Sequence, residues 1–300
     1  MSSLIEKISA ETRISIPDVK LTVRTASRRY KVYSIPKRDG TARIIAHPAR
    51  ELKAIQRALI SESPASLRVH SAASAYEDGS SIAKNANIHV KNSWLAKFDL
   101  ENFFNSITVS AWQMYLSKLE VDDEYVELSS KVFFWKPERR KSDLCLSVGA
   151  PSSPFASNRY MFSFDQYVSD YCTKNNLAYS RYADDIAISS QSEIELIHLQ
   201  EVIEEGLKES RLKLNSRKTL LLGPGQRRVV TGVILKNDKK ISLGRGRKRI
   251  IESMVHNYAK GKPSSSLEVI RGHLALLKMI DPDGYNRIRK RYENCTSLFK

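Results

Sequence analysis

Apolar and polar positions alternate on both sides of an acidic pair in the second half of the chain. The run 179–182 carries two tyrosines, Asp184 and Asp185 follow it, and Ile186 and Ile188 come next at a spacing of two. A period of two is typical of a half-buried β-strand, and Asp tolerates the backbone of a tight turn. We therefore expect a β-hairpin with two carboxylates at its tip. A polar, solvated turn is the alternative.

A second apolar run ends at another carboxylate. Residues 93–98 have a strand-like pattern, Asp99 follows them, and two aromatic residues, Phe103 and Phe104, come shortly after. A carboxylate at the end of a buried strand is costly unless it is paired or binds a metal ion. Considered alone, Asp99 has the simpler alternative of capping a helix.

The N-terminal part predicts a further hairpin, with a basic tip. Residues 30–35 and 42–46 have strand-like patterns, Lys37 and Arg38 lie in the turn between them, and Arg43 follows closely. Arg and Lys donate charge-assisted hydrogen bonds to phosphate oxygens. The tip is therefore a candidate clamp for a triphosphate, with a solvated basic turn as the alternative.

Helical patterns occupy much of the remaining chain. Residues 51–61 predict an amphipathic helix. The segment from Gly149 to Pro154 begins a long helical pattern, and its glycine permits close approach of the backbone. As a helix start, this segment needs no ligand. Near the C-terminus, the capping box from Ser265 to Glu268 predicts the start of another helix.

The charge of the chain favours a polyanionic partner. The 300 residues carry a net charge of +16, and the last 60 of them hold 13 Lys and Arg against 5 Asp and Glu. A basic surface of this kind is typical of nucleic-acid binding. The length suggests two domains or one multi-lobed unit, and 41% hydrophobic residues suffice for a core.

The sequence does not favour membrane, disulfide or zinc chemistry. It contains no run of 18 apolar residues, and its charged N-terminus lacks the pattern of a signal peptide. Cys145, Cys172 and Cys295 are odd in number and widely spaced, which predicts neither a disulfide framework nor a zinc site. We expect a cytoplasmic protein with no membrane partner.

The order of the acidic segments is more specific than any one of them. Asp99 and the Asp184–Asp185 pair lie about 85 residues apart at predicted strand ends, and three such carboxylates suit two Mg²⁺ ions that activate a hydroxyl and stabilise a leaving pyrophosphate. With the segment 149–154 between them, the block 98–104 and the Tyr-Ala-Asp-Asp box at 182–185 strongly resemble the reverse transcriptases.

The resemblance narrows to the retron reverse transcriptases of bacteria. Asn85 to His89 resembles the Asn-Ala-x-x-His element of that group, and Val230 to Gly232 resembles its Val-Thr-Gly element. Both flank the polymerase segments in the expected order. By its spacing alone, His89 would be no more than a structural histidine.

The resemblance implies an α+β fold shaped like a right hand. Its fingers would comprise 1–92 with part of 112–145, its ferredoxin-like palm 93–240, and its small, basic helical thumb 241–300. One departure from the family lies at Val148, where many reverse transcriptases have Gln. The side-chain amide that would hydrogen-bond near the nucleotide is therefore missing, while the metal chemistry is unaffected.

The resemblance also implies roles for the matching residues. Asp99, Asp184 and Asp185 would bind two Mg²⁺ ions, and Lys218 would protonate the leaving pyrophosphate. Phe104 would clash with a ribose 2′-OH and so select deoxynucleotides. The nucleotide would further contact Lys37, Arg38, Arg43 and Gly149. The RNA would contact Asn85, His89, Thr231, Gly232, Arg245, Arg247, Lys248 and Arg249.

The implied reaction uses a structured non-coding RNA that is made alongside the enzyme. Synthesis from dNTPs would start at a guanosine 2′-OH and give a branched RNA–DNA, and an effector protein would join in defence against phage. A reverse transcriptase of another bacterial lineage, intron-encoded or diversity-generating, is one alternative, against which we count the short chain. A catalytically silent RNA-binding scaffold is the other, and the presence of all three acidic residues argues against it.

Overall fold

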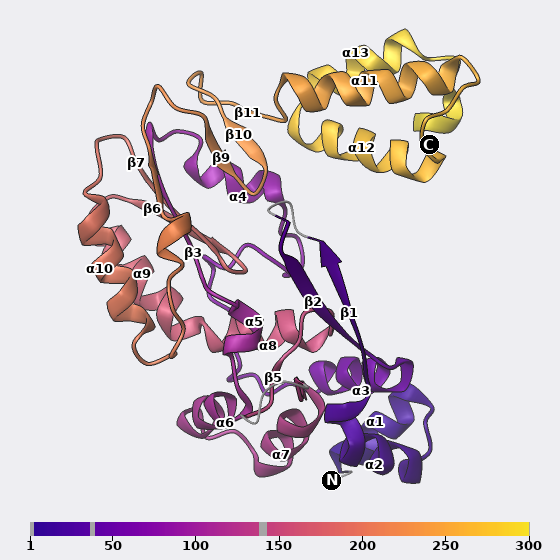
Figure 1. Ribbon diagram of the computed structural model, residues 1–300, viewed down its shortest axis with the longest axis vertical. Helices are drawn as coiled ribbons and strands as arrows, with labels where there is room; N and C mark the ends of the chain where they lie inside the picture. The colour runs from indigo at the N-terminus through magenta and orange to yellow at the C-terminus, as the bar shows by residue number, and fades with distance from the viewer. Residues whose placement is uncertain (1–2, 37–39, 138–142, 300) are drawn as a thin grey trace.

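The computed structural model describes residues 3–36, 40–137 and 143–299. Figure 1 shows N-terminal helices at one end of the molecule, a sheet with its helices in the middle, and a helical C-terminal part at the other end. Among the described residues, no helix is long and apolar enough to cross a membrane.

The middle of the molecule is built on a four-stranded antiparallel sheet in the order β6–β7–β3–β8. Its strands are β3 (Trp94–Asp99), β6 (Ala178–Tyr182), β7 (Asp185–Ser190) and β8 (Leu220–Leu222). The predicted hairpin is confirmed, because β6 and β7 pair around a turn at Ala183 and Asp184. The predicted strand that ends at Asp99 is also present, as β3.

Helices cover both faces of this sheet. Successive side chains of a strand point to opposite faces, so Phe98 and Ile186 lie on one face, in a hydrophobic core shared with α9 and α10. Leu95 and Ala187 lie on the other face, in a second hydrophobic cluster shared with α4. The covering helices are α4 (Ile82–His89), α8 (Ser152–Tyr160), α9 (Phe162–Lys174) and α10 (Leu196–Leu207).

Short helices form the N-terminal end of the molecule, joined there by a segment from the middle of the chain. They are α1 (Leu4–Thr12), α2 (Ile16–Thr25), α3 (Arg50–Ser61), α6 (Val109–Lys118) and α7 (Asp123–Val132), with the short strands β4 (Phe134–Trp135) and β5 (Cys145–Leu146). The short helix α5 (Phe103–Ser106) lies beside α8 in Figure 1. Figure 1 shows α6 and α7 beside α1 to α3.

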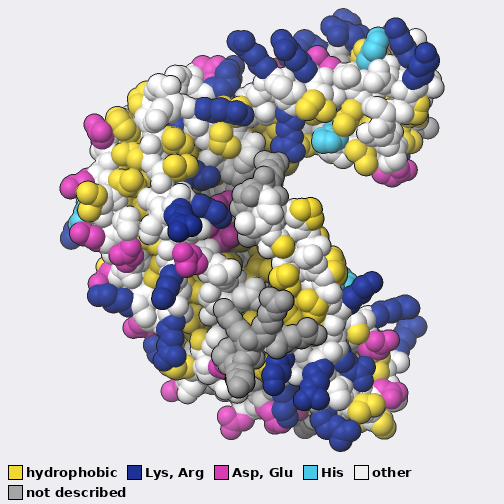
Figure 2. Space-filling model, in the orientation of Figure 1, with side chains coloured by type: hydrophobic (Ala, Val, Ile, Leu, Met, Phe, Trp, Pro, Cys, Tyr) yellow, Lys and Arg dark blue, Asp and Glu magenta, His cyan; other side chains and the backbone are white. Residues whose placement is uncertain are grey.

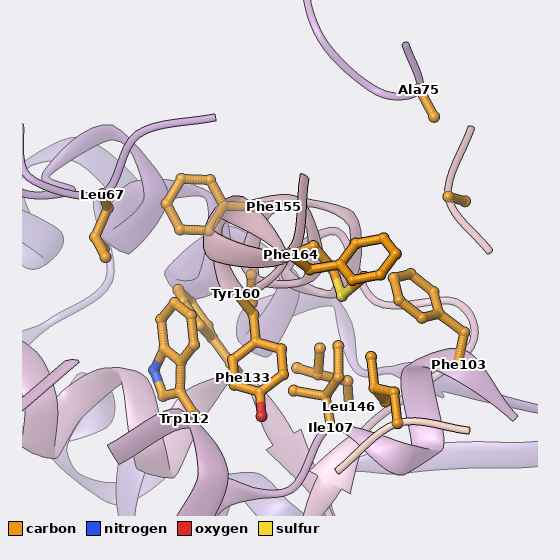
Figure 3. Packing of buried hydrophobic residues seen from close by; sticks show 14 of the residues in the cluster. Leu67, Ala75, Phe103, Ile107, Trp112, Phe133, Leu146, Phe155, Tyr160 and Phe164 are labelled. Carbon is orange, nitrogen blue, oxygen red and sulfur yellow. The ribbon is translucent and has the colours of Figure 1, made fainter. Parts of the chain in front are cut away.

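Aromatic residues fill the core between these helices and α8 (Figure 3). The rings of Trp112 and Phe133 lie 6.4 Å apart, and Phe133 meets Phe155 of α8 edge to face at 6.0 Å. The buried indole N–H of Trp112 donates to Ser129 Oγ at 3.0 Å. Its polar edge is therefore satisfied inside the core.

The second predicted hairpin is also present and rests against the start of α8. It consists of β1 (Tyr30–Pro36) and β2 (Ala42–Pro48). The amide of Ala46 donates to the Val148 carbonyl at 3.0 Å. Gly149 next to it has φ +120°, and a Cβ there would lie 3.1 Å from Ile45 Cγ2. The glycine thus allows the loop to lie directly on β2.

The C-terminal part combines a small sheet with a helical bundle. Its elements are β9 (Arg228–Val230), β10 (Val233–Leu235), β11 (Ile241–Ser242), α11 (Arg245–Ala259), α12 (Leu267–Ile280) and α13 (Pro282–Arg291). Ser266 caps α12 by accepting a hydrogen bond from the Val269 amide. The predicted start at Ser265 was therefore wrong by one residue.

Replacing Gly149 with Ala should destabilise the fold. The new Cβ would crowd Ile45 and the Ala46 carbonyl, and the positive φ disfavours any side chain. We expect a loss of about 1–3 kcal/mol in the free energy of unfolding, measured by urea denaturation. Gly272→Ala in α12, where a Cβ meets nothing within 4 Å, is the control and should gain about 0.4–1 kcal/mol. If Gly149→Ala and Gly272→Ala were equally stable, the close approach of Gly149 to Ile45 would be contradicted.

Candidate active site

Asp99 and Asp185 face each other across paired strands. Asp99 is the last residue of β3, Asp185 is the first of β7, and the two are direct partners in the antiparallel register. Because opposite residues of an antiparallel pair share a face, their carboxylates lie on the same side of the sheet. Asp184 immediately precedes β7, after Ala183 with φ +57°. The pairing thus gathers three carboxylates from segments far apart in sequence.

The turn that carries Asp184 is held from both sides. The Leu100 amide, just after β3, donates to the Asp184 carbonyl at 3.2 Å. The guanidinium of Arg181 donates through Nη1 to the Ala183 carbonyl at 3.0 Å. Both bonds use backbone acceptors, so the Asp184 side chain remains available for other contacts.

Lys218 lies directly against Asp99. Its Nζ donates to both carboxylate oxygens of Asp99, each at 2.9 Å. The Asn215 amide donates to the Asp99 carbonyl at 2.8 Å, which fixes the loop that carries Lys218 beside β3. The Lys218 side chain is 59% exposed, so this loop presents its ammonium group from the solvent side.

The charges of this cluster act on one another. Burial raises the pKa of Asp184, and the negative charges of Asp185 and Asp99 raise it further. Burial likewise raises the pKa of Asp185, with Asp99 adding to the rise and Lys97 opposing it. Hydrogen bonding to Asp99 raises the pKa of the Lys218 amine. Burial and mutual repulsion thus both favour the neutral form of Asp184 and Asp185.

The donor chemistry of the cluster fits a hard divalent cation, because all its ligands are carboxylate oxygens. Within the described ranges, no group of three or more His, Cys, Asp or Glu side chains is arranged to hold a metal ion. Both oxygens of Asp99 contact Lys218 instead. A cation that used all three carboxylates would therefore compete with Lys218 for Asp99.

The structure describes three of the five predicted nucleotide contacts. Phe104 is half-buried at the start of α5, with its ring 5.3 Å from that of Phe103. Arg43 is exposed on β2. Gly149 lies against β2, so its close backbone approach is to the protein itself. Lys37 and Arg38 fall outside the described residues.

The structure corrects the expectation that Asn85 and His89 contact RNA directly. Both side chains are buried in α4, with exposed fractions of 1% and 0%. His89 Nδ1 lies 2.7 Å from Ser189 Oγ of β7, and its Nε2 lies 2.8 Å from Ser180 Oγ of β6. His89 therefore ties α4 to two strands of the sheet, and no ring nitrogen is left for a ligand.

The second retron-like element lies next to the first. Thr231 and Gly232 form the turn between β9 and β10, both with positive φ. Thr231 Oγ1 donates to the Ile82 carbonyl at the start of α4, at 3.5 Å. Thr231 and Ile82 are 149 residues apart in sequence. Their contact joins the two retron-like elements at one junction between the sheet and the C-terminal part.

Basic side chains follow this junction. Arg245, Arg247 and Arg249 are exposed at the start of α11, whereas Lys248 is half-buried and forms an ion pair with Asp281. Figure 2 shows the molecule as a C with an open cleft between the C-terminal helices and the N-terminal part, and with dark-blue Lys and Arg side chains along the C-terminal helices. Of the four predicted basic contacts, the three arginines are therefore exposed on the surface, and Lys248 is paired with Asp281 within the C-terminal part.

The sequence interpretation missed a buried ionic network behind the acidic turn. Arg181 and Asp165 are both fully buried, and Arg181 donates to the carboxylate at 2.8 and 2.6 Å. Tyr179 donates to the same carboxylate at 2.6 Å. The alternation of the strand gave a signal for it. Arg181 lies two positions from Tyr179 and from Ala183, so it shares their buried face.

Comparison with known proteins identifies the class of protein. Residues 35–235 match the family described as reverse transcriptase (RNA-dependent DNA polymerase). Retron Ec83 reverse transcriptase of Escherichia coli is 41% identical, over 93% of this chain and 91% of that one. Retron Ec86 reverse transcriptase of Escherichia coli is 29% identical, over 95% of this chain and 87% of that one. The chain therefore belongs to the reverse transcriptase family, as an RNA-directed DNA polymerase of the bacterial retron type.

Solved structures support the right-hand fold. Telomerase from Candida albicans aligns over 90% of this chain and 58% of that one, with a TM-score of 0.50 and 13% identity. Telomerase from Candida tropicalis aligns over 92% and 62%, with a TM-score of 0.50 and 14% identity. The chain thus spans less than two thirds of those telomerases. The predicted α+β right hand is confirmed, and members of the family generally use divalent metal ions.

His89 should make the stability of the protein depend on acid pH. Burial lowers the pKa of His89 from 6.5 to about 4, so the folded state favours the neutral ring. The stabilisation is complete above pH 6.5 and is lost as the pH falls towards 4, a change of roughly 3 kcal/mol. Urea denaturation across this range should show it.

The matched variants are His89→Gln and His198→Gln. His89→Gln removes the titrating ring and should flatten this part of the curve, whereas His198, which is 55% exposed on α10, should keep the wild-type slope when replaced. A wild-type slope in His89→Gln would show that another group is responsible.

Proposed function

We propose that this enzyme copies a structured non-coding RNA into DNA from a guanosine 2′-OH and so makes a branched RNA–DNA. The observation that carries the proposal is the direct pairing of Asp99 with Asp185, beside Asp184, in a chain with a net charge of +16. The relatives that match most of its length are retron reverse transcriptases.

The three carboxylates would hold two Mg²⁺ ions in this proposal. Bound there, the ions would activate the attacking hydroxyl and neutralise charge on the transferring phosphate. The protein's contribution is placement: the β3–β7 register sets Asp99 opposite Asp185, and the bonded turn sets Asp184 beside them. Arg43, with Lys37 and Arg38, would hold the triphosphate through charge-assisted hydrogen bonds.

Lys218 would act on the leaving group. Its ammonium group lies at the acidic cluster, and hydrogen bonding to Asp99 raises its pKa, so it carries a proton at neutral pH. A protonated amine beside a departing pyrophosphate acts as a general acid. Phe104 would close the sugar side of the site, where a ribose 2′-OH would meet its ring.

The partner RNA would lie in the cleft. The exposed Arg245, Arg247 and Arg249 would contact its backbone, because RNA helices are recognised by shape and phosphate rather than by base edges. Thr231 and Gly232 lie at the same junction. We further propose that the enzyme acts in the cytoplasm, together with an effector protein, in defence against phage.

The test is the nucleic acid that co-purifies with the protein from cells carrying its native locus. Samples treated with RNase, with DNase or with a 2′–5′ debranching enzyme are compared on a denaturing gel. We expect a discrete DNA whose mobility changes after RNase and after debranching. Linear DNA, or RNA without DNA, would contradict the proposal.

The matched control is the double variant Asp184→Asn, Asp185→Asn. It keeps the shape of the turn but removes two ligand charges, so it should bind the RNA and make no detectable DNA, a loss of at least about 10³-fold. DNA synthesis by this variant would show that the metal ligands are misassigned.

Phe104→Ala should relax discrimination between deoxy- and ribonucleotides. Removing the ring opens space on the sugar side, and we expect ribonucleotide incorporation to rise roughly 10–100-fold relative to deoxynucleotides. Primer extension with single nucleotides measures the ratio, and Phe104→Tyr, which keeps the ring, should retain the wild-type ratio. Unchanged discrimination in Phe104→Ala would rule out a gate at this position.

A further inference from the structure

Tyr76 is an aromatic residue on the surface beside the catalytic turn. Its side chain is 54% exposed, and its ring centroid lies 6.4 Å from that of Tyr182, tilted by 39°. Burial raises the pKa of Tyr76, the charge of Asp184 adds to the rise and the charge of Arg43 opposes it. The phenol is therefore within electrostatic reach of both a catalytic carboxylate and the proposed triphosphate contact.

The backbone at Tyr76 is in a conformation that bulky residues rarely adopt. Its φ is +66°, in the left-handed region that favours Gly or Asn. Such a conformation persists only where the surrounding structure fixes it, and it is enriched at functional sites. The contacts that fix Tyr76 are therefore informative.

The flanks of Tyr76 are held by one buried amide. Asn158 Nδ2 donates to the Ala75 carbonyl at 2.8 Å and to Glu77 Oε1 at 2.9 Å. Asn158 is fully buried in α8, so the bonds are shielded from water. Just upstream, the Ser74 amide donates to the Arg181 carbonyl at 2.7 Å, which lays the segment along β6.

The same network holds the catalytic turn. Arg181 Nη1 donates both to Asn158 Oδ1, at 3.3 Å, and to the Ala183 carbonyl, at 3.0 Å. The Arg181 guanidinium is itself fixed by two hydrogen bonds to the buried Asp165. One guanidinium thus connects the loop that presents Tyr76 with the turn that presents Asp184.

We propose that the ring of Tyr76 packs against the base of the incoming deoxynucleotide, and that Asp165, Arg181 and Asn158 fix this ring relative to Asp184. Phe104 is assigned to the sugar and Arg43 to the triphosphate, and no side chain is yet assigned to the base. An exposed aromatic ring accepts any base, because each base has a π-face. The inference rests on the nucleotide roles proposed above and is independent of the branched product.

The test measures single-nucleotide incorporation on an RNA template with an annealed DNA primer. Tyr76→Ala should raise the KM for each dNTP about tenfold, with kcat changed less than about threefold because the ring binds rather than reacts. Tyr76→Phe should restore the wild-type KM, since stacking needs no hydroxyl. The Kd for primer–template, measured by fluorescence anisotropy, should stay unchanged.

The control is Tyr167→Ala, a tyrosine of α9 that is 44% exposed and lies outside the site, and it should leave the KM unchanged. An unchanged KM in Tyr76→Ala would overturn the proposal. So would a rise in the primer–template Kd by the same factor, which would place the ring against the nucleic-acid end. Absence of extension by the wild-type enzyme would instead contradict the polymerase function itself.

The positioning network is tested by coupling. Asn158→Ala should also raise the KM for dNTPs, and the double variant Asn158→Ala, Tyr76→Ala should raise it no further than Tyr76→Ala does. Because Asn158 is fully buried, the same comparison is made at a partly exposed side chain: Glu77→Ala is measured alone and together with Tyr76→Ala. Additive effects on KM in either pair would show that the network does not act through Tyr76.

Discussion

The pairing register between β3 and β7 is the constraint on which the rest of the site depends. Side chains of a strand alternate between faces, so a slip of one residue would send Asp185 to the opposite face from Asp99. The register is held because Phe98 and Ile186 must share the core with α9 and α10. Burial of apolar residues on one face thus decides where the carboxylates lie on the other.

The second support is electrostatic and lies beneath the turn. A fully buried arginine is tolerated when its charge is paired and its donors are bonded, and Arg181 meets both conditions through Asp165 and the Ala183 carbonyl. The face in front gathers three carboxylates, and burial, with mutual repulsion adding to it, raises the pKa values of Asp184 and Asp185. The buried Asp165–Arg181 pair on one face of the sheet therefore supports the turn that carries the mutually repelling carboxylates on the other face.

Patterns of short range were predictable from the sequence, and contacts of long range were not. The hairpin around Asp184 and the strand ending at Asp99 followed from alternation, and family-like segments supplied their roles. No spacing indicated that His89 would be enclosed by two serines, or that Asp165 would pair with Arg181. The start of α12 was placed one residue early because Glu268 stands three residues after Ser265, as in a capping box, whereas the helix is capped by Ser266, which accepts from the Val269 amide.

The smaller hydrophobic cluster has a mechanical consequence. It joins Ile251 of α11, Val233 of β10 and Ala86 of α4 to Leu95 and Ala187, which lie on the same face of the sheet as Asp99 and Asp185. Closely packed side chains transmit displacement because they have little free volume to absorb it. If RNA binds as proposed above, a duplex that pushes the C-terminal helices outward loads the strands that carry Asp99 and Asp185, and the spacing of these carboxylates becomes sensitive to the width of the duplex.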